Sequence, residues 1–80
     1  MSDLDAAFAK ALKQLRKNSG MCQEEMGARA GLHRTYISQL ERGLKDPSLE
    51  TMFKVARALQ ISPVELMAEI QRHLESDNDH

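Results

Sequence analysis

The stretch Gln23–Gly43, QEEMGARAGLHRTYISQLERG, contains two short helical patterns on either side of a glycine. Apolar residues recur in both patterns every three or four positions, which is the spacing of one helix face. Gly31 stands where a left-handed C-terminal cap would end the first helix. The stretch therefore predicts one helix over 23–30 and a second over 34–42, joined by a short turn, which is a helix-turn-helix.

Before this stretch, an apolar stripe predicts one further helix. The stripe steps by three or four residues and consists of Leu4, Phe8, Leu12 and Leu15. Ser2 and Asp5 are spaced as a capping box at the start of this helix, and Asn18-Ser19-Gly20 is suited to end it.

After the stretch, two serines mark the starts of two more helices. Ser48 is suited to cap a fourth helix, whose apolar positions are Leu49, Met52, Phe53, Ala56 and Leu59. Ser62-Pro63-Val64-Glu65 combines a capping serine, a proline at the first helical position and a glutamate that can bond back to the cap. The fifth helix is expected to reach about Glu75. The chain thus predicts an all-α, five-helix domain over residues 1–75 and a polar, disordered tail over 76–80.

Composition narrows the class of protein. A length of 80 residues allows one domain, whose buried surface is only marginal without a second subunit. The longest apolar run, Ala6–Ala9, is far shorter than a membrane helix needs. The single cysteine, Cys22, cannot form an internal disulfide, so that a cytoplasmic protein without membrane contact is expected.

Charge is segregated along the chain although the net charge is only −1. Residues 10–45 carry eight basic and three acidic side chains, a balance of +5, whereas residues 1–9 carry −2 and residues 46–80 carry −4. This segregation allows one basic face on a neutral protein, as nucleic-acid binding requires.

The second helix of the predicted helix-turn-helix has an outward side of short or polar groups that could reach the edges of DNA bases. These groups are Arg34, Thr35, Ser38 and Gln39. Gly27 falls where the two helices pass close together, so that a side chain larger than a methyl group would push them apart.

These residues resemble the phage-repressor and Cro type of helix-turn-helix, also called the xenobiotic-response-element family. The resemblance rests on the stretch quoted above and on PSLETMFKVARALQISPVELM, and it covers about Leu12–Met67. It implies a lambda-repressor-like domain that binds a palindromic operator in double-stranded DNA as a homodimer and regulates transcription, most simply as a repressor, without a cofactor. The run Arg34–Ser38 and the chain length also resemble the controller proteins of restriction–modification systems, which implies RNA polymerase as a further partner and activation as the alternative.

The resemblance also implies roles for single residues. Base contacts would come from Arg34, Thr35, Ser38 and Gln39. Phosphate or sugar contacts would come from Gln23, Tyr36, Arg42 and Lys45, and His33 is expected to reach a phosphate as well. Arg16 and Glu41 match an ion pair that ties the first helix to the third. Cys22 and His33 depart from the family, because Ser or Thr is usual at both cap positions, and both caps should be weaker for it.

The fifth helix has a wider apolar arc than one core contact needs. Met67, Ile70 and Leu74 are therefore expected to face a second subunit.

Other classes of function find less support in the sequence. The three histidines and the cysteine have no metal-ligand spacing, and no serine or cysteine nucleophile has a base nearby, so neither a metal site nor an enzyme is expected. A protein-interaction module of the antitoxin type, using the same helices, is the alternative; its binding would depend little on salt.

Overall fold

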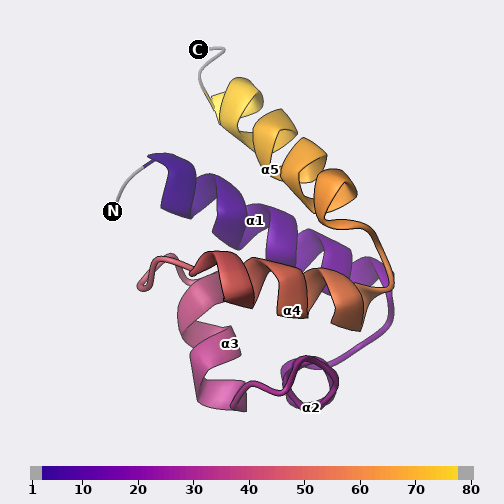
Figure 1. Cartoon of the computed structure of the whole chain (residues 1–80). Coiled ribbons are helices and arrows are strands. Elements are labelled where there is room, and N and C mark those ends of the chain that lie inside the picture. Colours follow the sequence, from indigo (N-terminus) through magenta and orange to yellow (C-terminus); the bar gives the residue numbers. More distant parts are fainter. Residues whose placement is uncertain (1–2, 78–80) are drawn as a thin grey trace.

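A computed structural model of the chain describes residues 3–77. Five helices follow one another, namely α1 (Asp3–Asn18), α2 (Gln23–Ala30), α3 (Arg34–Glu41), α4 (Leu49–Leu59) and α5 (Pro63–Asp77). Figure 1 shows α2 and α3 at one end of the molecule and α5 at the other, with α1 and α4 between them. The expected all-α fold is confirmed, and residues 3–77 contain no strand.

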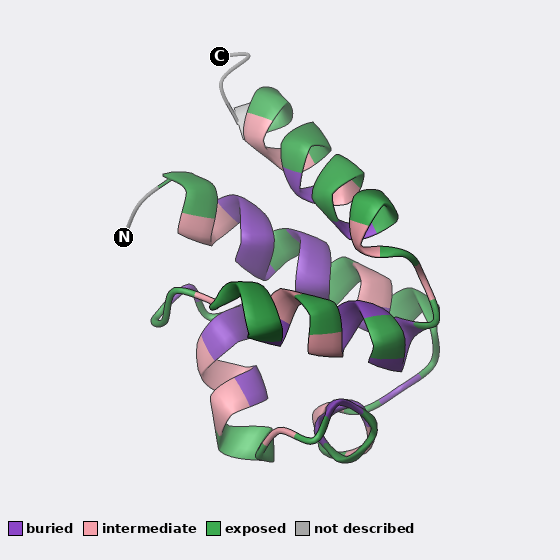
Figure 2. Ribbon diagram, viewed as in Figure 1, coloured by how far each residue is buried: buried purple, intermediate pink, exposed green. Residues whose placement is uncertain are grey.

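The core is formed by side chains of all five helices. Its largest fully buried side chains are Phe8, Leu12, Met26, Ile37, Leu40, Val55 and Leu66. Figure 2 shows buried segments alternating with exposed ones along α1 and α4, as in helices that bury one side. Burial of each such side chain contributes about 1.5–3 kcal/mol. Apolar burial from four helices therefore positions α3, which is only eight residues long.

Each helix after α1 is preceded by a residue whose side chain accepts a hydrogen bond from a backbone N–H of that helix. Ser48 Oγ accepts from Thr51 N at 3.0 Å. Ser62 Oγ accepts from Glu65 N at 3.1 Å, and Glu65 Oε1 accepts from Ser62 N at 3.3 Å, which is the expected capping box. The caps of α2 and α3 differ in chemistry and are described with the site below.

The helix bounds differ from the expected ones at two places. Arg42 caps α3 instead of belonging to it. Helix α5 continues to Asp77, beyond the expected end at Glu75, because no glycine or proline follows to stop it. Ser76 therefore belongs to the helix, whereas residues 78–80 of the expected tail, and Ser2 of the expected capping box, lie outside the described residues.

One side chain lies differently from expectation, and one residue has an unusual backbone conformation. Leu4 does not complete the buried stripe of α1, since 59% of it is exposed. Gln60 ends α4 in the left-handed conformation, with φ of 61°, a position at which glycine is the usual residue. In the described part of the chain, no helix has both the length and the apolar character that a membrane crossing needs.

Candidate nucleic-acid interface

Helix α2 passes very close to the turn that leads into α3. A Cβ atom on Gly27 would lie 2.6 Å from the carbonyl oxygen of Leu32, a backbone atom that cannot move aside cheaply. Even a methyl group is therefore too large at this position, whereas the sequence analysis excluded only side chains larger than a methyl group. Gly31, with φ of 72°, supplies the left-handed turn, and Leu32 N donates to the Gly27 carbonyl at 2.8 Å.

The two helices of this motif begin with unusual caps. Cys22 Sγ accepts from Glu25 N at 3.4 Å at the start of α2. His33 Nδ1 accepts from Thr35 N at 3.0 Å at the start of α3. Sulfur is a weak acceptor, whereas the imidazole nitrogen is a full one, so that the cap of α3 is the better of the two.

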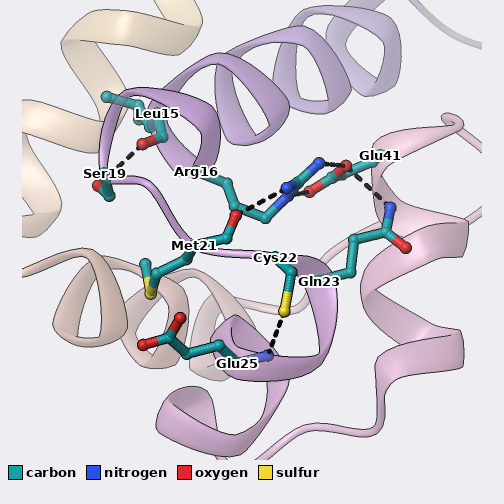
Figure 3. Close-up of polar contacts among 8 residues, drawn as sticks. All are labelled: Leu15, Arg16, Ser19, Met21, Cys22, Gln23, Glu25 and Glu41. Carbon is teal, nitrogen blue, oxygen red and sulfur yellow. Dashed lines mark hydrogen bonds and ion pairs between the residues drawn. The ribbon is translucent and has the colours of Figure 1, made fainter.

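A buried ion pair joins α1 to the end of α3 (Figure 3). Arg16 Nε donates to Glu41 Oε2 at 2.6 Å, and Arg16 Nη2 donates to Glu41 Oε1 at 3.0 Å. Gln23 Nε2, from the first residue of α2, donates to the same Oε1 atom at 3.0 Å. We call these three side chains the clamp, because they come from three different helices and meet at one carboxylate.

The clamp is almost closed to water. Only 11% of the Arg16 side chain and 2% of the Glu41 side chain are exposed. The hydrogen bond to Glu41 raises the pKa of Arg16, against the opposing effect of burial. Arg16 Nη1 also donates to the Met21 carbonyl at 2.9 Å, so that the loop before α2 is held as well. Among the described residues, no buried side-chain nitrogen or oxygen lacks a hydrogen-bond partner.

Helix α3 turns one side to the core and the other side to solvent. Ile37 and Leu40 are fully buried, whereas Arg34 and Thr35 are exposed. Ser38 and Gln39, expected on the same outward side, are half-buried. The outward side therefore has its most accessible groups at the front of the helix, next to the turn.

The Arg34 guanidinium has one neighbour of opposite charge. Its Nη1 atom lies 3.9 Å from Glu24 Oε2, and both side chains are largely exposed. An ion pair of this kind contributes about 0–1 kcal/mol, so that the guanidinium can exchange Glu24 for another partner at little cost.

The residues expected to reach phosphates differ in how far they are exposed to solvent. Arg42 and Lys45 are exposed, as is the His33 ring. Tyr36 is half-buried, and its hydroxyl lies 3.4 Å from the hydroxyl of Thr51. Gln23 uses its amide nitrogen for Glu41, which leaves one hydrogen of that nitrogen for a further acceptor.

The residues expected to face a second subunit do not lie together on the surface. Met67 is 54% exposed and Leu74 is half-buried, but Ile70 is only 4% exposed and belongs to the core. The side chain of Ile70 completes the packing within its own chain, which leaves it little surface for a second subunit.

Sequence reasoning missed two participants in this region. The Met21 carbonyl is a backbone atom, which no pattern of side chains can reveal. Thr51 is buried near Tyr36, and the only signal for it was its place three residues after the Ser48 cap.

Comparison with known proteins decides the family. A model of the family described as "Helix-turn-helix" matches residues 12–66. The chain belongs to the helix-turn-helix family. An HTH-type transcriptional regulator of Sinorhizobium fredii is 44% identical over 65 residues, which are 81% of this chain and 84% of the relative. The control protein C.BamHI of Bacillus amyloliquefaciens is 39% identical over 61 residues, 75% of each chain.

Solved structures in this family share the fold. The restriction–modification controller protein C.AhdI from Aeromonas hydrophila has a TM-score of 0.77 at 39% identity, over 82% of this chain and 98% of that one. The controller protein C.Esp1396I, solved as a tetramer with its natural 35 base-pair operator, has a TM-score of 0.87 at 26% identity, over 92% and 97% of the two chains. The class expected from the sequence, a DNA-binding regulator of transcription, is confirmed, and the family is not a class of enzymes.

Proposed function

We propose that this helix-turn-helix protein binds a palindromic operator as a homodimer, with α3 of each subunit in the major groove. One observation carries the proposal: α3 exposes Arg34 and Thr35 at its front while the clamp locks its rear end to α1. A recognition helix needs both properties, because base edges can be read only from a fixed position.

Arg34 is the strongest candidate for reading a base. A guanidinium can donate two hydrogen bonds to O6 and N7 of guanine, which discriminates against other bases by about 1–3 kcal/mol. Thr35 can contact a base through its hydroxyl or methyl group. Ser38 and Gln39 lie farther along the helix and are half-buried, so that they would add fewer contacts to base edges than Arg34 and Thr35.

Contacts to the DNA backbone would set the register of α3. Arg42 and Lys45, just after the helix, are exposed cations suited to phosphates. Because His33 Nδ1 accepts a hydrogen bond, the neutral ring carries its hydrogen on Nε2, which is a donor for a phosphate at the front of the helix. Gln23 and Tyr36 would add a hydrogen bond each.

Two copies of α3 about 34 Å apart would enter successive major grooves on one side of the duplex. Occupancy of an operator within a promoter excludes RNA polymerase, so that repression needs no further contact. We also propose that the protein works in the cytoplasm, where the DNA of the relatives' source organisms is transcribed. Transcription in vitro from a promoter that contains the selected operator tests the sign: less transcript supports repression, and more transcript indicates contact with RNA polymerase.

Selection of binding sites from random DNA tests the proposal directly. We expect a two-fold symmetric consensus whose binding weakens with salt, with a slope of about 0.9 per phosphate contacted in a plot of log affinity against log salt concentration. No enriched sequence and no salt slope would overturn DNA binding and favour the antitoxin-like alternative, a module that binds another protein.

Arg34→Ala tests the base contact. We expect affinity for the selected site to fall about 5–150-fold, and the preference at one base pair in each half-site to relax. Arg72→Ala is the matched control, since Arg72 is an exposed arginine on α5, far from α3 (Figure 1). Equal losses from both variants would show that Arg34 contributes only charge.

A further inference from the structure

Three hydroxyl groups connect the start of α4 with α3. Ser48 Oγ donates to Thr51 Oγ1 at 3.0 Å, and Thr51 Oγ1 lies 3.4 Å from the hydroxyl oxygen of Tyr36. We call Ser48, Thr51 and Tyr36 the hydroxyl chain. Its last two members are 15 residues apart in the sequence, so that the chain is a tertiary contact between the two helices.

The first bond of the hydroxyl chain has a fixed direction. Thr51 N donates to Ser48 Oγ at 3.0 Å, which is the cap of α4, so that the Ser48 hydroxyl keeps its own hydrogen for Thr51 Oγ1. A hydroxyl group has one hydrogen and can accept through its lone pairs. Thr51 Oγ1 is therefore the acceptor in this bond, and its own hydrogen is left for another oxygen.

The Thr51 hydrogen needs an acceptor inside the protein. Only 6% of Thr51 is exposed, and buried hydroxyl groups are normally hydrogen-bonded. The Tyr36 oxygen is within reach, whereas the Ser48 oxygen is already the donor in its bond with Thr51. The Thr51 hydroxyl is therefore placed to donate to Tyr36, which leaves the phenolic hydrogen of Tyr36 for a partner outside the chain.

Tyr36 lies between the core and the outward side of α3. Its half-buried side chain packs against the core, and the preceding residue, Thr35, is exposed at the front of the helix. A phosphate oxygen of DNA accepts hydrogen bonds and donates none, so that a tyrosine that contacts a phosphate must supply the hydrogen. The direction of the bond between Thr51 and Tyr36 thus decides whether Tyr36 can make that contact.

We propose that Thr51 is a positioning residue for DNA binding, which donates to the Tyr36 oxygen and so directs the phenolic hydrogen toward a phosphate of the operator. The inference rests on the proposed function and deepens it, because it names the residue on which the phosphate contact of Tyr36 depends. Thr51 is too deeply buried to contact DNA itself. It acts through Tyr36.

The start of the hydroxyl chain strengthens the donor at its end. The Ser48 oxygen accepts from the first turn of α4, where backbone N–H groups carry partial positive charge. Hydrogen bonds in series polarise one another, so that a hydroxyl that accepts one bond becomes a better donor in the next. The Tyr36 hydroxyl at the end of the chain is thus a stronger donor than an isolated phenol.

The hydroxyl chain also complements the clamp. The clamp ties the rear end of α3 to α1, whereas the hydroxyl chain ties a side chain from the front half of α3 to α4. A side chain that is already held in place loses less conformational freedom when a ligand binds. Tyr36 is therefore oriented before the duplex arrives.

Raman spectroscopy of the protein without DNA tests the direction of the bond. Tyr36 is the only tyrosine of the chain, and the tyrosine Fermi doublet reports whether the phenolic oxygen accepts or the hydroxyl donates. We expect Thr51→Val, which keeps the shape of the side chain, to shift the doublet toward donor character. Thr51→Ser, which keeps the hydroxyl, should match the wild type.

Two results of this measurement would overturn the proposal. A shift of the doublet in the opposite direction would show that Tyr36 donates to Thr51. An unchanged doublet would show that the two hydroxyls do not bond. Circular dichroism and sedimentation velocity show whether each variant keeps the fold and the oligomeric state of the wild type, and Thr51→Ala serves if the valine variant does not fold.

Affinity for the selected operator tests the consequence for DNA binding. We expect Tyr36→Phe to weaken binding about tenfold and Thr51→Val about two- to tenfold, since each loses all or part of one hydrogen bond to a phosphate. The double variant should bind no more weakly than Tyr36→Phe, because Thr51 acts only through that hydroxyl. Losses that multiply in the double variant would show a different route and overturn the proposal.

Ser62→Ala is the matched control for stability. It removes the cap of α5, where Ser62 Oγ accepts from Glu65 N, and leaves the hydroxyl chain intact. We expect it to lower the melting temperature and to leave operator affinity unchanged. A loss of affinity equal to that of Thr51→Val would attribute the effect of Thr51 to stability and contradict a positioning role.

The two proposals fail in different ways. A wild type that binds no DNA overturns the proposed function and, with it, a role for Thr51 in DNA binding. If Arg34→Ala weakens operator binding but Tyr36→Phe and Thr51→Val do not, the proposed function stands and only the role of Thr51 is contradicted.

Discussion

The helix-turn-helix pair and the pair that follows it are held in different ways. Helices α4 and α5 begin with serine caps whose oxygens accept backbone hydrogen bonds at 3.0 and 3.1 Å. Helices α2 and α3 begin with Cys22 and His33 and have eight residues each. Isolated helices shorter than about 12–15 residues are marginal in water, so that α2 and α3 depend on contacts with the rest of the chain.

Those contacts are the clamp and the close approach at Gly27. They bring together atoms that are 25 residues apart in the chain, as in the bond from Arg16 to Glu41. The helix-turn-helix pair therefore depends on a contact between residues distant in sequence, whereas α4 and α5 combine strong local caps with their packing against α2 and α1. Substitutions in the two pairs should separate these contributions.

The largest loss is expected from the clamp. Glu41→Ala leaves the Arg16 guanidinium buried without a counter-charge, which should lower the free energy of unfolding by about 3–5 kcal/mol. Urea unfolding followed by circular dichroism measures this loss, and Glu41→Gln, which keeps the volume, serves if the alanine variant does not fold. Glu25→Ala is the control: its exposed pair with Arg29 should contribute under about 1 kcal/mol. Similar losses of stability at both positions would show that the buried ion pair of the clamp contributes no more than an exposed one.

A smaller loss is expected at Gly27. In Gly27→Ala the new methyl group meets the Leu32 carbonyl, so that α2 and the turn must move apart at a cost of about 1–3 kcal/mol. Thermal unfolding gives the loss, and crystal structures of the variant would show the shift. Ala28→Ser, an exposed position on the same helix, should stay within about 0.5 kcal/mol of the wild type. A Gly27→Ala variant as stable as the wild type would contradict the close approach.

The caps should respond in opposite directions. Ser48→Ala removes a good acceptor and should cost about 1 kcal/mol, whereas Cys22→Ser replaces a weak acceptor by a good one and should gain up to about 1 kcal/mol. Chemical unfolding of both variants measures the difference. If Cys22→Ser lost stability instead, the thiol would be making a contact that the hydroxyl cannot replace.

The smallest effect is expected at the pair of carboxyl groups formed by Asp5 and Asp46, and it depends on pH. Since Asp5 raises the pKa of Asp46 in the folded chain, the shared proton stabilises the fold in acid, and this contribution is lost as the pH rises through the raised pKa. In dilute, monomeric protein, Asp46→Asn should therefore match the wild-type melting temperature in acid and slightly exceed it at neutral pH. A constant difference across the whole range would rule out the carboxyl pair as its cause.

Much of the fold was predictable because its signals are local. Helical spacing gave all five helices, and Gly31 and the serine caps placed their ends to within about two residues. The exceptions depend on atoms distant in sequence or on weak signals. Gln60 takes a left-handed conformation without being glycine, and Leu4 stays largely exposed although it continues the apolar stripe of α1.

The candidate site was less predictable from sequence. The outward residues Arg34 and Thr35 follow from helical period alone, since the opposite side of the helix carries the apolar residues. The involvement of Gln23 in the clamp does not, because it depends on where three helices meet. The place of Ile70 in the core likewise depends on how α5 rotates against α1, which periodicity leaves open.

The division of labour along α3 has a practical consequence for redesign. Ile37, Leu40 and Glu41 anchor the helix from one side, while Arg34 and Thr35 take no part in that anchorage. Operator preference can thus be changed by substituting Arg34 and Thr35 alone, because these substitutions leave the packing of α3 intact. Conversely, a peptide of residues 34–41 would keep the base-contacting residues but lose the packing that holds them in position. We therefore expect such a peptide not to recognise an operator.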